Sequence, residues 1–320
     1  MVNLEKNKNI FVAGHNGMVG SAVVRAIKNK EEYNVITKSR NELDLTNHNL
    51  TSEFIRDENI DIIINAAAKV GGILANDTYP YDFIMDNLKI QNNLIEAAVK
   101  MQITKFIFLG SSCIYPKYAP QPIKEEYLLT GTLEPTNQWY AIAKISGVMA
   151  CIAAKKQHGL NSVSLMPTNL YGFNDNFDLH TSHVLPAMIR KFHEAKMTDT
   201  NVQLWGSGSP FREFLFVDDL ASAVELALTK NLKDDIYNVG YGTDISIKDL
   251  AELVQEITRH KGKIIWDKTK PDGTPKKLMD SSKLRSVGWQ PNIKIREGIE
   301  MTYEWYIKTI KNNISVKGYN

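Results

Sequence analysis

Short apolar runs alternate with amphipathic stretches through the first half of the chain. The apolar runs are rich in Val, Ile and Phe, have the length of strands, and lie at residues 10–14, 34–37, 60–65, 105–109 and 162–166. The stretches between them repeat apolar residues at helical spacing. The first follows a turn and ends at residue 28, and the others lie at residues 81–101 and 140–158. Strands that alternate with helices in this way predict βα units on a parallel sheet.

The pattern changes after Gly172. An Asn-rich and Asp-rich loop follows, and then helices are predicted at residues 183–195, 246–260 and 296–310, with a short strand into Trp205 and a Pro/Gly turn at 271–275. We therefore predict an α/β fold, a Rossmann-type doubly wound parallel sheet with a smaller C-terminal lobe. The first lobe is expected at residues 1–172, with some later segments returning to it, and the second mainly at residues 173–320.

The bulk composition argues against several classes of protein. The 320 residues include 38 basic and 36 acidic side chains, a formal net charge of +2, and 43% of them are apolar. This balance predicts neither a nucleic-acid-binding nor a membrane-surface protein. The first ten residues are polar, so we expect no signal peptide, and no apolar run approaches the ~20 residues of a membrane span. Two cysteines without a CxxC motif or a metal-like cluster predict a cytoplasmic protein without a metal.

A glycine-rich turn joins the first predicted strand to the first predicted helix. Gly14, Gly17 and Gly20 have the spacing G-x-x-G-x-x-G. The first glycine permits the tight turn, the second lets the backbone approach a pyrophosphate, and the third lets the helix pack close to the sheet. The helix N-terminus adds N–H groups and partial positive charge. Three spaced glycines could also form an ordinary turn, but the strand–turn–helix context favours a dinucleotide site.

The end of the second predicted strand indicates which dinucleotide is bound. It runs into Lys38, Ser39 and Arg40, and the first carboxylate after it is Glu42. NAD sites usually place an acidic residue here, and NADP sites a basic one. We predict NADP(H), with Arg40 at the 2′-phosphate, while Asp44 could reach the adenine. The alternative interpretation is a solvated basic turn.

Tyr140 and Lys144 lie one helical turn apart in a predicted helix and share one face of it. A tyrosine that donates a proton to a carbonyl needs its pKa lowered from about 10, and a nearby ammonium lowers it by favouring the phenolate. Ser111 follows a predicted strand, at the sheet edge where ligands of open α/β folds bind. Tyr-x-x-x-Lys pairs are common on ordinary helices, and the position of Ser111 favours catalysis.

These motifs together resemble the extended short-chain dehydrogenase/reductase family. The resemblance includes the glycine turn, the segment Asn65 to Ala68, Ser111, the Tyr140 and Lys144 pair, and the pattern R-x-F-x-x-V-x-D at residues 212–219. Narrower stretches, which cover nearly the whole chain, resemble the GDP-L-fucose synthases of that family. They are residues 13–15 (AGH), 68–73 (AKVGGI), 109–117 (LGSSCIYPK), 132–137 (TLEPTN), 166–172 (MPTNLYG), 175–177 (DNF), 182–184 (SHV) and 270–275 (KPDGTP).

The resemblance implies a two-stage reaction on GDP-4-keto-6-deoxy-D-mannose. Protons on C3 and C5 flank the ketone, so they can be removed through enolates and returned to the other face. Cys113 matches the base of the family and His183 its acid. These roles suit the two side chains, since a thiolate can take a proton and an imidazole can return one. NADPH would then reduce C4, with Tyr140 supplying the proton, Ser111 bonding the carbonyl oxygen and Lys144 tuning Tyr140. On residue type alone, Cys113 could be a small buried hydrophobe, as we expect for Cys151, and His183 a capping or core histidine.

The resemblance also implies two sets of binding residues, so that the first lobe would bind NADP(H) and the second mainly the GDP-sugar. The residues implied for the cofactor are Gly14, His15, Asn16, Gly17, Met18, Val19, Gly20, Arg40, Asp44, Leu109, Gly110, Ser112, Lys144, Pro167, Thr168, Asn169, Leu170 and His183. The residues implied for the substrate are Lys191, Trp205, Arg212 and Asp272. Lys191 and Asn16 depart from the family, which commonly has Arg and a basic residue at these positions. A homodimer through the helices at 81–101 and 140–158 is expected by analogy.

The sequence also bears on four other functions. A 4,6-dehydratase would carry an Asp-Glu pair where this chain has Cys113 and Ile114, and an NAD-dependent 4-epimerase would leave Cys113 and His183 without a role. An epimerase-reductase for a related GDP-4-keto sugar stays open, because small changes in a pocket accommodate one hydroxyl. A non-catalytic NADP(H) sensor is disfavoured, because such a protein is expected to lose Ser111, Tyr140 or Lys144.

Overall fold

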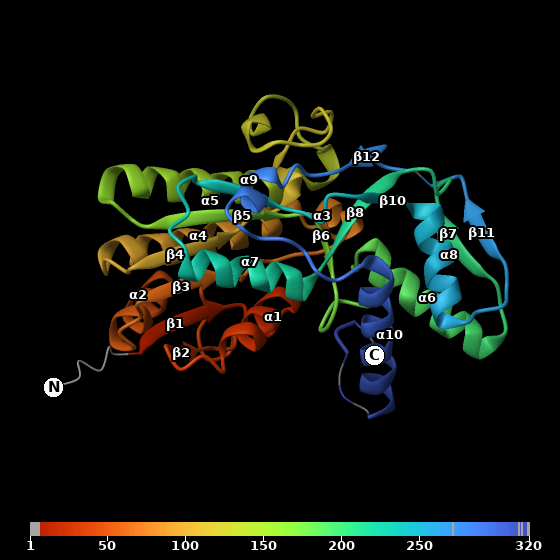
Figure 1. Cartoon of the computed structure of the whole chain (residues 1–320), viewed down its shortest axis with the longest axis horizontal. Helices are drawn as coiled ribbons and strands as arrows, with labels where there is room; N and C mark the ends of the chain where they lie inside the picture. Colours follow the sequence, from red (N-terminus) through yellow and green to blue (C-terminus); the bar gives the residue numbers. More distant parts are fainter. Residues whose placement is uncertain (1–6, 271, 313, 315, 319–320) are drawn as a thin grey trace.

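The computed structural model describes residues 7–270, 272–312, 314 and 316–318. Most of the segment used for the signal-peptide expectation, and Pro271 of the predicted turn, therefore lie outside the described residues. Figure 1 shows a larger body that contains the long parallel sheet and a smaller one built around α6, α8 and α10. The predicted α/β fold class is confirmed by this arrangement.

The larger body is a six-stranded parallel sheet in the order β2-β1-β3-β4-β5-β9. The order reverses beside β1, as in a doubly wound sheet. Its elements are β1 (Lys8–Ala13), α1 (Met18–Ile27), β2 (Tyr33–Ile36), α2 (His48–Asp57), β3 (Ile62–Asn65), α3 (Ile73–Thr78), α4 (Pro80–Lys100), β4 (Lys105–Leu109), α5 (Gln138–His158), β5 (Ser162–Pro167), α7 (Val217–Thr229), β9 (Ile236–Val239) and α9 (Ser282–Ser286), with the 3₁₀ turns η1 (Ser112–Ile114), η2 (Glu125–Tyr127) and η3 (Pro135–Asn137).

Apolar residues cover both faces of this sheet. Alternate residues of β1, Ile10 and Val12, pack with α1 and α7, while Phe11 and Ala13 pack with the side of α2, α4 and α5. This alternation follows from the two-residue period of a strand. The buried run in β3 is explained in the same way, because a central parallel strand is covered on both sides.

The smaller body has its own core. Its elements are β6 (Asn169–Tyr171), α6 (Val184–Thr198), β7 (Val202–Trp205), β8 (Phe211–Phe216), β10 (Asp244–Ser246), α8 (Ile247–Thr258), β11 (Ile264–Asp267), β12 (Lys276–Lys277) and α10 (Ile295–Lys311). Strand β8 pairs with β6, β10 and β12, while β7 pairs with β11. Tyr171, Phe177 and Tyr306 are among the large side chains buried between α6, α8 and α10.

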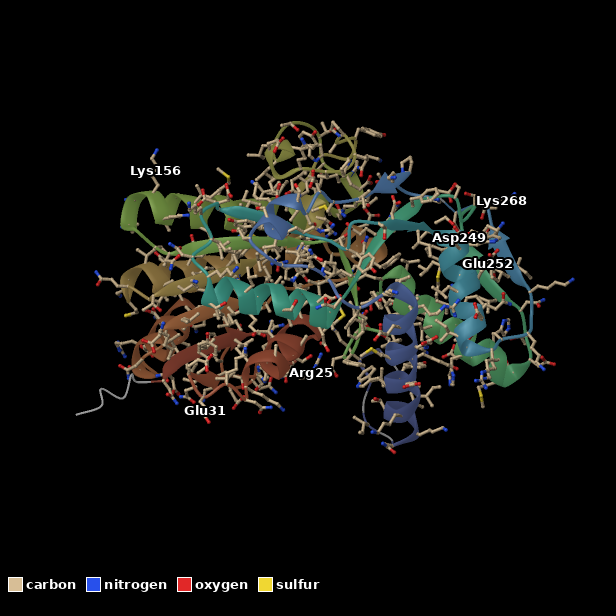
Figure 2. The ribbon with its side chains drawn as sticks, viewed as in Figure 1. Arg25, Glu31, Lys156, Asp249, Glu252 and Lys268 are labelled. Carbon is tan, nitrogen blue, oxygen red and sulfur yellow. The ribbon has the colours of Figure 1, made fainter. Side chains whose placement is uncertain are left out.

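The two bodies are joined through α1, α7 and the segment after β6. Arg25 of α1 pairs with Asp218 of α7 at 2.6 Å, and its guanidinium lies 5.3 Å from the ring centroid of Phe173. Figure 2 labels Arg25 and shows other charged side chains, such as Lys156 and Lys268, projecting outward at opposite ends of the molecule. Strand β9 belongs to the large sheet and α7 packs on it, so a segment after residue 172 lies with the larger body, while the division near residue 172 stays a prediction.

Candidate active site

One cavity of about 1620 Å³ extends from the turn after β1 to the small sheets of the second body. Single small-molecule pockets usually have ~300–1,000 Å³, so this cavity has room for two ligands. Every residue that the sequence analysis predicted for catalysis, cofactor binding or substrate binding lines it. The structure thus brings together side chains that are separated by more than half of the chain.

The glycine turn forms the first end of this cavity. Gly14 has a φ of +83°, and a Cβ on it would lie 2.7 Å from backbone atoms of Ala67. A Cβ on Gly20 would collide with the Gly14 carbonyl, so this third glycine is needed for the close packing of α1 on β1. Gly17 precedes α1 without a side-chain cap, which leaves the first N–H groups of that helix available to an anion. These features fit a dinucleotide pyrophosphate.

The segment after β2 contains a carboxylate that sequence reasoning did not assign. The backbone N–H and the hydroxyl of Ser39 both donate to the carboxylate of Glu42, at 2.7 and 2.5 Å. These hydrogen bonds lower the pKa of Glu42, the hydroxyl having the larger effect. Arg40 is exposed in the same part of the cavity. The carboxylate of Asp44 accepts from the backbone N–H and the hydroxyl of Thr46, at 3.0 and 2.8 Å, which lowers its pKa.

The carboxyl end of β4 and the start of α5 hold the central group of polar side chains. Lys144 is 3% exposed, and its ammonium donates to the carbonyl of Leu109 at 2.8 Å. Burial lowers the pKa of Lys144 to about 8. Its nitrogen lies 5.8 Å from the ring centroid of Tyr140. These distances bring Lys144 and Tyr140 onto one side of the cavity, as their helical spacing predicted.

The expected lowering of the Tyr140 pKa by Lys144 is wrong. Burial raises the pKa of Tyr140, and the negative charge of a Cys113 thiolate raises it further. The ammonium of Lys144 does not offset this, because its hydrogen bond goes to a backbone carbonyl. The phenol is therefore protonated at neutral pH, the form that a proton donor needs.

Cys113 lies in η1, and Ser111 immediately before that turn accepts a hydrogen bond from the backbone N–H of Cys113 at 3.3 Å. Burial raises the pKa of the Cys113 thiol, whereas Lys277, Ser111 and Lys144 each act to lower it. Cys151 has a different setting. It lies on α5 and packs into the apolar core, and burial raises its pKa to about 12, which confirms the interpretation of this side chain as a small buried hydrophobe.

His183 immediately precedes α6 and does not cap it. His183 lines the cavity and is exposed to the solvent within it. Burial lowers its pKa, and the positive charges of Lys277 and Lys317 lower it further. These effects favour the neutral form of the imidazole. A lowered pKa makes the protonated ring a stronger acid, and an anionic group nearby would favour the protonated form.

The predicted substrate residues lie at the far end of the cavity. Trp205 is 59% exposed, and the ammonium of Lys270 lies 5.5 Å from its ring centroid. Asp272 accepts from the backbone N–H and hydroxyl of Ser207, at 2.6 and 2.8 Å, and so holds the turn that follows Trp205. Lys191 donates to the carbonyl of Gln203 at 3.1 Å. These contacts position a flat aromatic surface beside cationic groups.

Arg212 lies on β8 at the same end, and burial lowers the pKas of both Arg212 and Lys191. One guanidinium nitrogen of Arg212 donates to the Phe211 carbonyl at 2.7 Å. Cations in a partly dry site bind anions more strongly than exposed cations do, because water competes less. Two partly buried cations at this end are compatible with the role that the resemblance implies for them, which stays a prediction.

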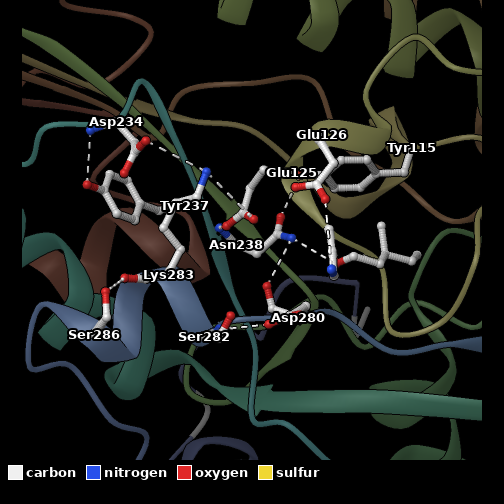
Figure 3. A network of polar contacts seen from close by, with 12 residues as sticks. Tyr115, Glu125, Glu126, Asp234, Tyr237, Asn238, Asp280, Ser282, Lys283 and Ser286 are labelled. Carbon is white, nitrogen blue, oxygen red and sulfur yellow. Dashed lines mark hydrogen bonds and ion pairs between the residues drawn. The ribbon is translucent and has the colours of Figure 1, made fainter.

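A buried polar network holds the segment after Cys113 against the rest of the sheet (Figure 3). The side-chain oxygen of Asn238 on β9 accepts from the hydroxyl of Tyr115 at 2.6 Å, and its backbone N–H donates to Glu125 at 2.9 Å. The amide nitrogen of Asn238 donates to the carbonyls of Ile123 and Asp280, at 3.0 and 3.2 Å. Sequence reasoning missed this network, because its members come from separate parts of the chain.

Two further findings concern the described residues. Within residues 7–270 and the later described segments, His, Cys, Asp and Glu side chains do not gather in groups of three or more that could hold a metal ion. None of the helices in the same part of the chain is both long and apolar enough to span a bilayer.

The family model described as "NAD dependent epimerase/dehydratase family" matches residues 10–240. The chain therefore belongs to this family. Among curated proteins it is similar to the "Putative GDP-L-fucose synthase 2" of Arabidopsis thaliana, with 55% identity over 96% of this chain and 94% of that protein. It is also similar to the "GDP-L-fucose synthase" of Escherichia coli (strain K12), with 46% identity over 93% of this chain and 96% of that protein. The resemblance to the GDP-L-fucose synthases is thus confirmed.

Among solved structures, the chain is similar to a GDP-mannoheptose C4 reductase from Campylobacter jejuni with NADP bound. The identity is 36%, the alignment covers 94% of this chain and 98% of that chain, and the TM-score is 0.87. Both the sheet and the smaller body are therefore shared with this enzyme over nearly its full length.

Proposed function

We propose that this protein is an NADPH-dependent epimerase-reductase that converts GDP-4-keto-6-deoxy-D-mannose to GDP-L-fucose. The observation that carries the proposal is the presence of two kinds of reactive groups in one cavity. Ser111, Tyr140 and Lys144 suit ketone reduction, whereas Cys113 and His183 suit proton transfer at carbon. A plain 4-epimerase or reductase needs only the first kind. The names of the curated relatives support the same activity.

In the first stage, Cys113 in its thiolate form, which burial disfavours and the charges of Lys277 and Lys144 favour, takes a proton from the carbon next to the ketone. The S–H bond forms, the C–H bond breaks, and its electron pair moves into the enolate. The protonated form of His183, a stronger acid than an ordinary imidazolium because its pKa is lowered, returns a proton to the opposite face of the carbon, which inverts it. Ser111 donates to the oxygen on which the enolate charge develops, and such hydrogen bonds stabilise the transition state strongly in a dry site.

In the second stage, bound NADPH supplies the hydride that reduces C4. Tyr140 donates its phenolic proton to the C4 oxygen, which its raised pKa permits because the phenol is protonated beforehand. The ammonium of Lys144, held by the Leu109 carbonyl, lies where it can stabilise the phenolate that remains. The residues of the chain thus bind, orient and exchange protons in both stages.

For the cofactor, we propose that the Gly14 to Gly20 turn binds the pyrophosphate and Arg40 the 2′-phosphate, together with the other predicted cofactor residues. The printed description of the C. jejuni reductase, which has NADP bound, supports this cofactor. For the substrate, Lys191 and Arg212 bind the diphosphate of GDP, Trp205 packs against the sugar or base, and Asp272 holds the turn beside it. Residues 1–172 with α7 and β9 then form the cofactor domain, and residues 173–320 otherwise the substrate lobe.

A homodimer and a cytoplasmic location complete the proposal. Helices α4 and α5 pack against each other on one side of the sheet, and Ile142 and Met149 of α5 are exposed although apolar. Such residues on a long helix are typical of a two-fold interface. Both cysteines are free and buried, which suits a reducing compartment.

A related substrate is the second candidate. A "GDP-L-colitose synthase" of Yersinia pseudotuberculosis is 36% identical over 95% of this chain, and the C. jejuni reductase is named for a heptose. Small changes in a pocket can accommodate a sugar that differs by one hydroxyl. The choice between these sugars therefore needs a direct assay.

The test is the reaction of purified protein with GDP-4-keto-6-deoxy-D-mannose and NADPH in deuterated water, followed by NMR of the product. GDP-L-fucose with deuterium at C3 and C5 would support both stages and the substrate. GDP-D-rhamnose or its C4 epimer, free of deuterium, would reduce the function to a 4-reductase. Absence of NADPH oxidation with this sugar, but oxidation with a GDP-heptose ketone, would favour the second candidate.

A further inference from the structure

Residues 316–318, a short segment after α10, lie against the loop that leads into α6. The carbonyl of Lys317 accepts a hydrogen bond from the backbone N–H of Phe177 at 2.9 Å. The guanidinium of Arg190, on α6, donates through one nitrogen to the carbonyls of Gly318 and Phe177, at 2.6 and 3.1 Å. These three hydrogen bonds hold the 316–318 segment, the loop and α6 together.

Both sides of this contact are anchored in the core of the smaller body. Val316 is 3% exposed, Phe177 is fully buried, and the two side chains belong to the same apolar core. The ring of Phe177 stacks on that of Tyr306 of α10, with the ring centroids 4.6 Å apart. Moving either side chain would expose apolar area to water, which is unfavourable. The 316–318 segment is therefore a fixed support for the loop.

The supported loop, residues 177–182, forms a turn that ends at His183. The carboxylate of Asp178 accepts from the backbone N–H and the hydroxyl of Thr181, at 2.8 and 2.9 Å. The backbone carbonyl of Asp178 accepts from the N–H of Ser182 at 2.9 Å. Hydrogen bonds from an aspartate to the backbone that follows it fix the conformation of a turn. A support at the start of this turn therefore acts on the position of His183 at its end.

The other end of the turn touches the larger body. The backbone N–H of Gly72, the residue before α3, donates to the carbonyl of Thr181 at 2.7 Å. A Cβ on Gly72 would lie 2.7 Å from the carbonyl oxygen of Ser182, so the two backbones are in close contact. The turn is thus held by Gly72 at one end and by the 316–318 segment at the other, directly before His183 in the cavity wall.

We propose that the 316–318 segment is a positioning element for the epimerisation, which sets the place of the His183 imidazole. The proposal rests on the proposed function and adds a support to the same site. Proton transfer to one face of a carbon depends on the place of the donor, and a displacement of ~1 Å can lower a rate about 100-fold. Tyr140 and Lys144, which serve the reduction, lie on α5 of the larger body. Loosening the segment should therefore slow the epimerisation and affect the reduction much less.

Gly318 offers a substitution that loosens the segment, and Gly318 is not among the residues that line the cavity. It has a φ of +80°, and a Cβ on it would collide with the backbone nitrogen of Asp178. Gly159→Ala is the matched control, because Gly159 also has a positive φ, of +72°, but nothing lies within 4 Å of its added Cβ. In Gly318→Ala, amide hydrogen exchange of the peptide that contains residues 177–182, measured by mass spectrometry, should be about tenfold faster than in Gly159→Ala and the wild type.

Arg190→Gln tests the same contact from α6, because it removes the donor to the Gly318 and Phe177 carbonyls. Its control is Glu194→Gln, which breaks the 2.7 Å ion pair between Arg190 and Glu194 and leaves the donor in place. Faster amide exchange of residues 177–182 is expected in Arg190→Gln and not in Glu194→Gln. An exchange rate at the wild-type value in both Gly318→Ala and Arg190→Gln would overturn the proposal.

The activity test follows the full-length protein with GDP-4-keto-6-deoxy-D-mannose and NADPH in deuterated water. Gly318→Ala should lower deuterium uptake at C3 and C5 about tenfold, whereas NADPH oxidation should fall much less, so that sugar reduced without epimerisation accumulates. Equal losses of both rates would mean that the variant is only destabilised, and would overturn the proposal. If the wild type takes up no deuterium, the proposed function fails, while amide exchange still tests whether the 316–318 segment supports the loop.

Lys317 separates a backbone support from a charge effect, because its side chain lines the cavity while its carbonyl bonds Phe177. Lys317→Ala removes the ammonium and keeps the carbonyl, so its loss of deuterium uptake should be smaller than that of Gly318→Ala. A loss as large as that of Gly318→Ala, with normal amide exchange of residues 177–182, would assign the effect to the ammonium and would also overturn the proposal.

Discussion

The two walls of the cavity hold their side chains in different ways. The sheet wall, formed by Ser111, Cys113, Tyr140 and Lys144, lies on the carboxyl end of β4 and on α5, and Lys144 is almost fully buried there. The lobe wall, formed by Lys191, Trp205, Arg212, Asp272 and Lys277, comes from α6, two small sheets and a loop. Trp205 is more than half exposed. Burial on the sheet wall shifts the pKas of the groups that exchange protons, whereas the lobe wall presents cations and an aromatic surface to an anionic ligand.

If this division holds, substitutions on the sheet wall change rate constants for chemistry, and substitutions on the lobe wall change binding. The largest effect is expected for Tyr140→Phe. Removing a proton donor lowers the rate of a proton-coupled step by about 10²–10⁴-fold, so NADPH oxidation should fall by this factor. Deuterium uptake at C3 and C5 should persist, because Cys113 and His183 are retained. Absorbance of NADPH and NMR of the sugar measure the two stages separately.

The division would be contradicted if Tyr140→Phe kept more than a tenth of its reductase rate, or if deuterium uptake fell in parallel. The phenylalanine retains the ring that packs near Lys144. A thermal unfolding curve of the variant is the control for a loss of folded protein.

The second largest effect is expected for Cys113→Ser. A hydroxyl is a much weaker base than a thiolate, so deuterium uptake at C3 and C5 should fall about 10²–10³-fold. Reduction at C4 should continue and give a sugar that is not epimerised. Cys151→Ala is the matched control, since Cys151 lies in the apolar core. Equal losses in both cysteine variants would show that the effect is structural.

The sheet wall could be predicted from the sequence in large part, because its signals are local. The strands at residues 10–14 and 105–109, the glycine turn and the helix that carries Tyr140 each have a pattern within a few residues. These elements were found as β1, β4, α1 and α5 with bounds that differ by a few residues. The spacing of apolar residues within a short segment distinguishes a helix from a strand, and it can be read without knowing which element packs against that segment.

Long-range elements were harder to predict. Helix α7 and strand β9 were not predicted, although Val217 to Thr229 has an amphipathic pattern. Strand β9 has only four residues, and its partner, β5, lies about 70 residues earlier. The hydrogen bonds between Ser39 and Glu42 have no periodic signal in the sequence. Such contacts depend on tertiary packing, so the residues of the lobe wall could be named only through a resemblance.

The third prediction concerns Asp175, in the loop that connects the two walls. Burial raises its pKa to about 7, and one of its carboxylate oxygens has no hydrogen-bond partner among the described residues. The unfolded chain releases this proton near the ordinary pKa of about 4, whereas the folded protein keeps it. Between these two values the unfolded state binds fewer protons, so the free energy of unfolding falls as the pH rises and becomes constant above the folded pKa.

Asp175→Asn removes this pH dependence. It should raise the free energy of unfolding at pH 8 by about 2–4 kcal/mol relative to the wild type, a gain of several degrees in Tm, and the gain should vanish near pH 4. Thermal unfolding of both proteins across this range measures the difference. A gain that is independent of pH would mean that the effect comes from packing and not from the carboxyl proton.

A smaller effect is expected on the lobe wall for Arg212→Lys. Lysine keeps the positive charge but loses the planar fork that binds two phosphate oxygens, so KM for the GDP-sugar should rise about tenfold with kcat nearly unchanged. Lys191→Arg is the matched opposite change, and it should lower KM about twofold to threefold by adding such a fork. Steady-state kinetics with varied GDP-sugar measure both. A fall in kcat at constant KM for Arg212→Lys would assign the lobe wall a part in the chemistry.

The smallest effect is expected at the cofactor end, for Glu42→Gln. The carboxylate of Glu42 occupies the N–H and hydroxyl donors of Ser39, next to Arg40, where the 2′-phosphate of NADPH is proposed to bind. A carboxylate there competes for these donors and repels a phosphate, whereas the neutral amide does not repel it. The variant should therefore lower KM for NADPH about threefold and leave KM for NADH almost unchanged, which steady-state kinetics with each cofactor would measure.

Added salt should reduce the difference, because Glu42 is exposed and its charge is screened. An equal change for both cofactors would mean that Glu42 acts on the shape of the turn after β2 rather than on the 2′-phosphate.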